Sequence, residues 1–402
     1  MDKKYIISKM KRFCGFIAGI VFYISGLLKL MDPTGAGLVV DEYLSFMHMS
    51  FLDFSAEFLG TAAAFAETLI GAALITGVWR PLASMAAFCL QTFFTLLTLA
   101  LVIFNPEMDC GCFGEAIHLT HVQTFVKNLI LLGLLAGYMI PLKDIGEPKP
   151  RKFAAFGIVA ISTAAFMAYS LLYIPLIDFT DYKATACIRA DIPGSAEEDM
   201  YEAVFIYEKD GKQETFQLSN LPDSTWTFIS TETKINKDAK ELMIPLSFYN
   251  LDGTYEDSLA YEGKVMVVSI YDPDMSQSRW NNVSEFTVSA QEAGFKVLIL
   301  TAGTPSEVLE CIPQDMRLLL EPHIYFCDYK TLISLNRSNG GVTFFSDGYL
   351  IRKWAARAIP DSAELQETAS TAETEIIIGH SSQGSLTMQG FLLYVFAVML
   401  LL

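Results

Sequence analysis

Six long apolar runs constrain this chain more than any other feature of its 402 residues. A run of about 20 apolar residues can cross the hydrocarbon core of a bilayer as a helix, because each helical residue adds about 1.5 Å. Hydrophobic residues make up 52% of the sequence, which is high for a soluble protein of this size. The sequence therefore predicts six membrane-spanning helices, over Phe13–Met31, Ser55–Val78, Leu82–Phe104, Val122–Pro141, Phe153–Ile174 and Leu386–Leu402.

Basic residues in the short loops predict how these helices are oriented. Lys and Arg concentrate in the cytoplasmic loops of membrane proteins. Here they gather at the N-terminus, at Arg80 and in residues 143–152, and the loops on the other side have almost none. We therefore expect a multi-pass protein of the bacterial inner membrane with a cytoplasmic N-terminus. No A-x-A-like cleavage site follows the first run, so we expect that run to stay as an anchor.

The membrane part divides into a bundle and further single helices. Residues 1–142 hold the first four runs, and the very short loop at Arg80 makes the second and third runs antiparallel neighbours. We expect these residues to form a four-helix bundle. A cytoplasmic linker at 143–152 then leads to a fifth helix at 153–174, and residues 386–402 are a candidate for a further span.

The remaining part is acidic and soluble. Residues 175–383 account for the whole net charge of −17, while the charges elsewhere cancel. The orientation places this part in the periplasm. Because the chain has no basic patch that could neutralise phosphates, nucleic acid is not an expected partner. The lipid bilayer and a periplasmic client protein are the expected partners.

Two regions can be distinguished within the soluble part. Residues 175–244 carry alternating runs and turn signals and are expected to be β-rich. Residues 245–358 alternate between strand and helix patterns in the order β-α-β-α-β-β, which is typical of a thioredoxin-like α/β domain. We expect residues 359–385 to be a linker to the last apolar run.

A Cys-x-Cys pair follows the third apolar run, at Cys110 and Cys112. A disulfide between such close cysteines is strained and therefore easily reduced, and Gly111 relieves the backbone sterics of the small ring. The pair therefore favours redox function. The alternatives are a static staple, which would stabilise little for so short a loop, or two idle thiols. A zinc site would need four ligands, and only His118 and His121 lie nearby, so no metal is expected.

Several polar residues interrupt the apolar runs, where polar groups are costly and usually face the protein interior. They could converge on a polar pocket beneath the cysteine loop, and they are Glu67, Gln91, Lys127 and Asn128. Two alternatives remain open: a Glu–Lys pair that sets helix register, or Lys127 extended to the membrane interface. Lys29 and Glu57 both lie near the outer surface and are expected to pair. His118 and Lys127 could tune the thiols above the pocket.

Four motifs resemble the DoxX/MauE-like membrane proteins over about residues 10–142. They are Ser25-Gly26-Leu27-Leu28-Lys29-Leu30-Met31-Asp32-Pro33, Glu67 with Gly71, Cys110-Gly111-Cys112-Phe113-Gly114, and Lys127-Asn128-Leu129. The resemblance implies a four-helix bundle associated with extracytoplasmic thiol–disulfide and quinone-linked chemistry. The MauE branch is implicated in disulfide formation in methylamine dehydrogenase. A quinone is therefore the cofactor class to consider.

The soluble part resembles the domain fused to DoxX-like proteins of Bacteroidetes, with a thioredoxin relative at its end. An active thioredoxin places Cys-x-x-Cys after its first strand, where this chain has residues 272–277 without cysteine. It also places a cis-proline before the hairpin, where this chain has Gly340 and Gly341. We therefore expect a degenerate domain that binds or positions a partner. Cys311 and Cys327 could form a structural disulfide or remain as inert thiols.

The leading interpretation is a membrane-bound extracytoplasmic thiol–disulfide oxidoreductase, or its electron-transfer subunit, with Cys110 and Cys112 as the redox pair. Enzymatic activity itself is left open. The competing interpretation is a non-enzymatic assembly factor that is anchored in the membrane and recruits a client. A small-solute transporter fits less well, since the sequence has no inverted repeats or broken helices.

Overall fold

The structure is a computed structural model that describes residues 3–106, 108, 110–117, 119–139, 148–188, 201–209, 212–217, 222, 226–235, 244 and 246–402. The chain forms two compact units. The first contains residues 1–179 together with 385–402, and the second contains residues 180–384.

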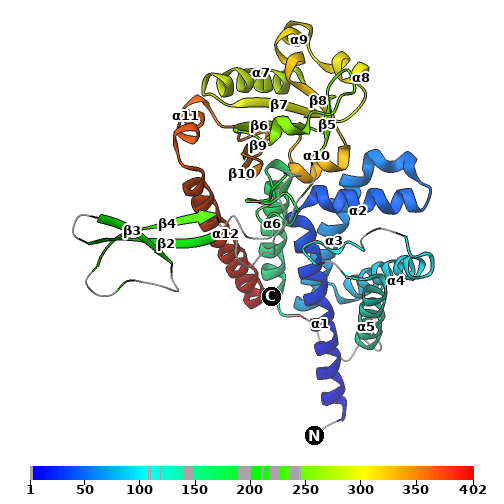
Figure 1. The fold of residues 1–402 in the computed structure, drawn as a ribbon. Coiled ribbons are helices and arrows are strands. Elements are labelled where there is room, and N and C mark those ends of the chain that lie inside the picture. The colour runs from blue at the N-terminus through cyan, green and yellow to red at the C-terminus, as the bar shows by residue number, and fades with distance from the viewer. Residues whose placement is uncertain are drawn as a thin grey trace. The chain divides into compact units, whose positions relative to one another are not determined.

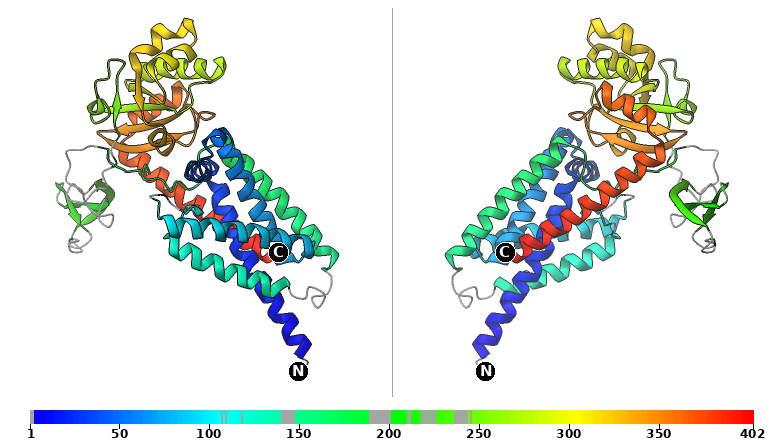
Figure 2. Two further views of the ribbon diagram at one scale, coloured as in Figure 1. Left: turned by 90° about the vertical axis from the view of Figure 1, so that its right-hand side faces the viewer. Right: turned by 90° about the vertical axis from the view of Figure 1, so that its left-hand side faces the viewer.

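The first unit is helical, and its core is a four-helix bundle (Figure 1). The bundle helices are α1 (Lys3–Met31), α3 (Ala56–Thr76), α4 (Arg80–Phe104) and α5 (His121–Met139). Helix α1 packs against α3 and α5, and α4 packs against α3 and α5, so the four contacts close into a ring. Figure 2 shows α4 and α5 side by side. The short turn before Arg80 makes α3 and α4 antiparallel, as the sequence predicts.

Further elements cover this bundle. They are α2 (Pro33–Phe46), the 3-10 helix η1 (Ser50–Ser55), the strand β1 (Cys112–Glu115), α6 (Pro150–Leu172) and α12 (Glu373–Leu401). Helix α2 begins at Pro33 because the Asp32 carboxylate accepts a hydrogen bond from the Gly35 amide at 2.9 Å. The end of α12 packs on the bundle through Val398, and Leu402 just after the helix joins it, in a cluster with Tyr23 of α1.

Glycines let α1 and α3 approach very closely. A Cβ atom at Gly71 of α3 would collide with the backbone nitrogen of Tyr23 and lie 2.7 Å from the carbonyl oxygen of Gly19, both in α1. A Cβ at Gly26 of α1 would lie 2.6 Å from the carbonyl oxygen of Ala64 in α3. Small residues at such contacts let membrane helices gain van der Waals packing, because lipid supplies no hydrophobic driving force between them.

The second unit is built around a six-stranded sheet with the order β10-β9-β6-β7-β8-β5. Its strands are β5 (Phe248–Tyr249), β6 (Lys264–Ile270), β7 (Lys296–Thr301), β8 (Ile324–Cys327), β9 (Gly341–Ser346) and β10 (Tyr349–Trp354). Strands β6, β7 and β8 are parallel, and β9 is antiparallel to β6. The accompanying helical elements are η5 (Asp257–Ala260), α7 (Gln277–Glu292), α8 (Pro305–Cys311), α9 (Gln314–Leu320), η6 (Glu321–His323), α10 (Tyr329–Leu335) and α11 (Ser362–Ser370).

Both faces of this sheet are covered, because its strands are apolar on both sides. Helix α7 packs through Trp280 on the face that holds Met266 and Val268 (Figure 1). Helix α10 packs through Leu332 on the opposite face, which holds Val267. This alternation follows from the two-residue period of a strand.

A separate three-stranded antiparallel sheet in the second unit has the order β3-β2-β4. Its strands are β2 (Tyr201–Lys209), β3 (Lys212–Gln217) and β4 (Thr227–Ile235). They lie in the segment for which the sequence predicts β structure. The turn signals at residues 210–211 and most of those at 221–223 lie outside the described residues.

The observed elements differ from the expectations at three places. Residues 359–385, expected to be a linker, contain α11 and the beginning of α12. Strand β8 was not predicted, because only four residues form it and its pairing partner β7 lies more than 20 residues away along the chain. Six helices are long and apolar enough to cross a membrane, as predicted, and each of the first five begins earlier than expected.

The contact between α1 and α3 gives a test of the fold. Gly71→Ala should lower the free energy of unfolding by about 1–3 kcal/mol, because the added methyl group meets backbone atoms that cannot move aside cheaply. Gly133→Ala in α5 is the matched control, since no atom lies within 4 Å of its Cβ position. The measurement is thermal unfolding of the purified full chain in detergent. Equal stability of the two variants would contradict the close contact.

Candidate functional site

A cavity of about 330 Å³ lies within the membrane unit, where α1 and α4 end and α3 and α5 begin. Helices α1 to α5 and the cysteine loop all contribute to its wall. Seven residues singled out from the sequence border it, and they are Lys29, Glu67, Gln91, Cys110, Cys112, Lys127 and Asn128. The eighth, His118, lies outside the described residues. The structure therefore brings these seven residues together around one cavity.

An ion pair between Lys29 and Glu67 borders this cavity. The ammonium nitrogen of Lys29 donates to a carboxylate oxygen of Glu67 at 2.6 Å, and the two side chains are only 14% and 7% exposed. Lys29 also lies over the ring of Phe94, 5.3 Å from its centre. The pair joins α1 to α3.

The expectation that Lys29 pairs with Glu57 is therefore wrong. Glu57 instead accepts a long hydrogen bond from the Thr34 hydroxyl at 3.4 Å. The reason is geometric, since side chains on a helix tilt toward its N-terminus. The Lys29 side chain accordingly reaches back into the bundle, where Glu67 lies, rather than outward to the first turn of α3.

Two hydrogen bonds from side-chain hydroxyls to backbone carbonyls hold the cysteine loop against α1 and α2. Ser25 donates to the carbonyl oxygen of Cys112, and Tyr43 donates to that of Cys110, both at 2.6 Å. Gly111 has a positive φ of 55°, and a Cβ there would clash with the side chain of Val39 in α2. Only glycine therefore fits between the two cysteines.

The thiols of Cys110 and Cys112 differ in solvent exposure. Cys110 is 5% exposed and buried against the bundle, whereas Cys112 is partly exposed. All seven cysteines of the chain lie in described segments and are present as thiols.

A network of amide hydrogen bonds lines part of the cavity and links α4 to α5. The amide nitrogen of Asn128 donates to the carbonyl oxygen of Phe94 at 3.3 Å and to the Thr98 hydroxyl at 3.2 Å. Gln91 donates to the carbonyl oxygen of Asn128 at 3.3 Å. All three polar side chains are buried, so these bonds satisfy groups that lipid could not.

The first turns of α5 stand next to the cysteine loop. Thr120 and Gln123 exchange hydrogen bonds between side chain and backbone, at 3.0 and 3.3 Å, in a reciprocal cap. Lys127, one turn further, lies over the ring of Phe113 at 4.7 Å from its centre. The ammonium group therefore turns toward the loop that carries the cysteines.

The cysteines of the second unit lie in less reactive surroundings. Burial raises the pKa of the Cys327 thiol to about 12. Burial, followed by the negative charges of Asp274 and Asp272, also raises the pKa of Cys311. The thiolate is the reactive form, and a raised pKa keeps both groups protonated at neutral pH. Of the two alternatives left open for them, the structure contains the thiols and no bridge.

Residues 272–276 follow strand β6 and contain no cysteine. Asp272 and Asn339 are joined by two hydrogen bonds, from the Asp272 amide at 3.2 Å and to its carbonyl oxygen at 2.7 Å. The Gly340 amide donates to the carbonyl oxygen of Ser269 at 2.7 Å. The two loops are therefore tied to each other without a thiol between them.

Sequence reasoning did not single out three residues that shape the site. Tyr43 and Ser25 hold the cysteine loop, and Thr98 anchors Asn128. Ser25 belongs to one of the four motifs that resemble DoxX/MauE-like proteins, and Thr98 is a hydroxyl-bearing residue within an apolar run. Tyr43 lies in the last turn of α2, which ends at Phe46.

No group of three or more potential metal ligands occurs among the described residues. The cavity therefore combines two thiols, one ion pair and an amide network, with apolar walls from Leu59, Leu97 and Val39. Such a mixture of apolar surface and a few polar groups is typical of a small-molecule site.

The ion pair gives a test of this geometry. Glu67→Gln should destabilise the protein by about 3–5 kcal/mol, because it leaves the Lys29 ammonium buried without its counter-charge. The double change Lys29→Met with Glu67→Leu should recover much of this loss, since neither charge then remains. Glu57→Gln is the matched control at the same end of the bundle. Thermal unfolding in detergent measures all of them, and a Glu67→Gln protein as stable as the parent would refute the pair.

Two segments of the chain match models of known protein families. Residues 6–141 match the model of the family described as Methylamine utilisation protein MauE. Residues 201–238, which span the three-stranded sheet, match a Domain of unknown function (DUF8463). No curated protein and no solved structure matches the chain. The six apolar helices and this partial match make the chain a multi-pass membrane protein whose bundle region is similar to the MauE family, which is consistent with an accessory role at the membrane.

Proposed function

We propose that this protein is an extracytoplasmic thiol–disulfide oxidoreductase of the membrane, or the electron-transfer subunit of one. Cys110 and Cys112 are the redox pair. The observation that carries the proposal is that both cysteines border one cavity together with the polar residues of the bundle. A loop cysteine with no redox role would have no need of a cavity behind it.

The difference in solvent exposure between the two thiols assigns a role to each. The partly exposed Cys112 is the sulfur that a client can reach, and the buried Cys110 is the resolving thiol. In the oxidised pair, a client thiolate attacks Cys112 and forms a mixed disulfide, and Cys110 leaves as a thiolate. A second client thiolate then displaces Cys112. The client gains a disulfide, and the two cysteines gain two electrons.

The cavity suggests where those electrons go next. Its apolar walls and the Lys29–Glu67 pair suit a quinone head group, which takes up two electrons and two protons. Lys29 offers a donor to a carbonyl oxygen of such a ring, and Lys127 lies between the cavity and the loop. Both lysines favour the negative charge that accumulates on a reduced sulfur or a reduced quinone.

In this proposal, the second unit is the domain that binds the client protein. Its parallel strands β6 and β7, with the hairpin β9–β10 beside them, support a thioredoxin-like arrangement. The loop at residues 272–276 has no cysteine, and the thiols of Cys311 and Cys327 are kept protonated. Recognition without electron transfer is therefore the role that its residues support.

Orientation is the first point to test. Basic residues at the end of the bundle opposite the cysteines favour a cytoplasmic N-terminus and a periplasmic second unit. An alkaline phosphatase fusion after Asp361 should therefore be active, and one after Gly77 should be inactive. The measurement is phosphatase activity in intact cells, with fusion levels compared by immunoblotting. The reverse pattern would place the cysteines in the cytoplasm and remove the basis of the proposal.

The roles of the two thiols predict unequal trapping. Cys110→Ser should accumulate a mixed disulfide with a client, because the Cys112 thiolate can attack a client disulfide, releasing one client thiolate, and no neighbouring Cys110 thiol can then displace the client. Cys112→Ser should accumulate several-fold less, since Cys110 is buried. The adducts are measured on non-reducing gels after acid quenching and alkylation in the native host.

Cys311→Ser is the matched control, because its thiol lies in the second unit and has a raised pKa. It should behave as the parent does. If neither loop variant forms a reducible adduct and both oxidise client thiols as well as the parent does, the redox proposal fails. The non-enzymatic assembly factor would then be the better interpretation.

A further inference from the structure

A second pocket lies at the opposite end of the membrane unit, with a volume of about 680 Å³. It is formed where α1, α4 and α6 begin and α3 and α5 end. Nothing in the proposed thiol chemistry uses it. It shares no lining residue with the cavity beneath the cysteines.

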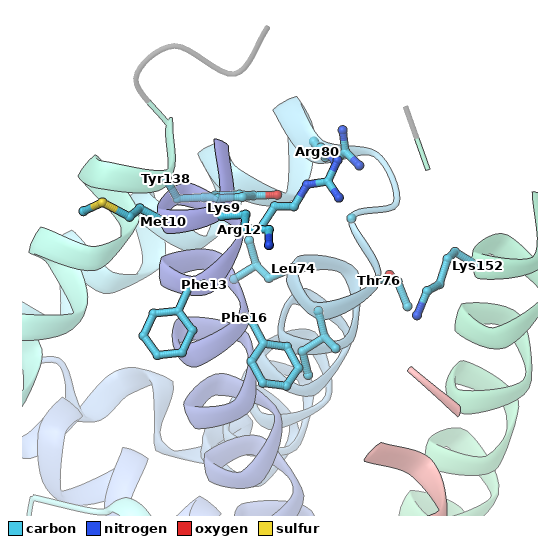
Figure 3. A pocket seen from close by; sticks show the side chains of 12 residues that line it. Lys9, Met10, Arg12, Phe13, Phe16, Leu74, Thr76, Arg80, Tyr138 and Lys152 are labelled. Carbon is cyan, nitrogen blue, oxygen red and sulfur yellow. The ribbon is translucent and has the colours of Figure 1, made fainter. Parts of the chain in front are cut away.

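The pocket is strongly basic. Among the residues that the structure describes, twelve line the pocket, and of these four carry a positive charge and none a negative one; the four are Lys9, Arg12, Arg80 and Lys152. They come from three different helices, so they meet only in the folded bundle. Figure 3 shows Lys9, Arg12 and Arg80 near Tyr138 at one end of the pocket. Lys152, on α6, donates to the backbone oxygen of Leu402.

Two side chains of the pocket, those of Tyr138 and Arg80, pack closely on glycines. The Tyr138 ring packs on Gly15 of α1, where a Cβ would lie 2.6 Å from its carbons. The Arg80 guanidinium lies over Gly77, where a Cβ would lie 2.9 Å from its Nε. The aromatic ring and the arginine are therefore positioned by close backbone approach rather than left to extend into solvent.

The other wall of the pocket is apolar and open to the surroundings of the bundle. Phe13 and Phe16 follow Arg12 along α1 and are 63% and 44% exposed (Figure 3). Leu74 and Ile75 of α3 line the same wall. A positive rim that continues directly into an exposed apolar wall matches a molecule with an anionic head and a hydrocarbon tail.

We propose that this pocket binds an anionic phospholipid of the cytoplasmic leaflet. The lipid phosphate lies between Arg12 and Arg80, and Lys9 adds charge from the preceding turn of α1. An acyl chain lies along Phe13 and Phe16 toward the middle of the membrane. Basic pockets between membrane helices on this side are suited to such head groups, and each nearby Lys or Arg strengthens attraction to anionic lipid.

A soluble anion would explain the basic residues of the pocket but not its apolar wall. Inorganic phosphate would use the arginines but would leave Phe13, Phe16 and the α3 wall without a partner. The volume also exceeds what a single phosphate ion fills and lies within the range of sites for larger ligands, about 300–1,000 Å³. We therefore commit to the lipid and let the experiment separate the two sources.

The test uses the purified full chain in a neutral detergent. Native mass spectrometry counts lipids bound after titration with phosphatidylglycerol or with phosphatidylcholine of the same chains. We expect phosphatidylglycerol to bind at least 10-fold more tightly. Inorganic phosphate at millimolar concentration should not displace it. Full displacement by phosphate would show a site for the soluble ion instead.

Variants locate the binding. Arg12→Gln with Arg80→Gln should weaken phosphatidylglycerol binding roughly 10-fold or more, because two cations near the phosphate are lost. The matched control is Lys149→Gln with Arg151→Gln, which removes the same charge from exposed positions beside the pocket. The control should bind as the parent does. An equal loss in both double variants would show only general attraction to the basic end of the protein and would overturn the site.

A third variant covers the case in which loss of Arg80 disturbs the fold. Met10→Glu places a negative charge on the pocket wall at a side chain that is 62% exposed, so packing is left intact. It should weaken phosphatidylglycerol binding and leave phosphatidylcholine binding unchanged. Unchanged phosphatidylglycerol binding in a folded Met10→Glu protein would likewise overturn the proposal.

Discussion

The close contact between α1 and α3 is the constraint on which the rest of the membrane unit depends. Gly71 and Gly26 allow the two helices to touch along their backbones. That approach brings Lys29 within 2.6 Å of Glu67, a distance that longer side chains at the contact would prevent. The ion pair in turn gives the cavity its charged side. Because lipid does not drive helices together, this packing and the polar contacts beside it must supply the association.

The bundle has two chemically different ends. One end carries the cysteine loop above a cavity with a buried ion pair and an amide network, and the other carries a basic pocket with an apolar wall. The same helices build both ends, because α1, α3, α4 and α5 contribute residues to both pockets. Electron transfer at one end and lipid binding at the other are therefore separable proposals, and variants at one end leave the lining of the other unchanged.

The second unit is a mixed-sheet domain in which the pKa values of the Cys311 and Cys327 thiols are raised. Its sheet is covered on both faces by apolar helices, and the loops at Asp272 and Asn339 are joined by hydrogen bonds. The thiols it retains are buried or face negative charge, which opposes ionisation. The proposed thiol chemistry therefore does not involve Cys311 or Cys327 and rests on the loop that holds Cys110 and Cys112.

Sequence alone determined the features that depend on local pattern. The six spans follow from run length, and the place of the cysteine loop follows from where the third run ends. The presence of Glu67, Gln91 and Asn128 inside apolar runs already indicated an internal polar site. Tertiary structure decided which groups meet. Lys29 binds Glu67 rather than Glu57, Tyr43 reaches the carbonyl of Cys110, and β8 joins β7. These contacts depend on how helices rotate about their axes and on pairing between distant segments, and neither is encoded in the spacing of residues along the chain.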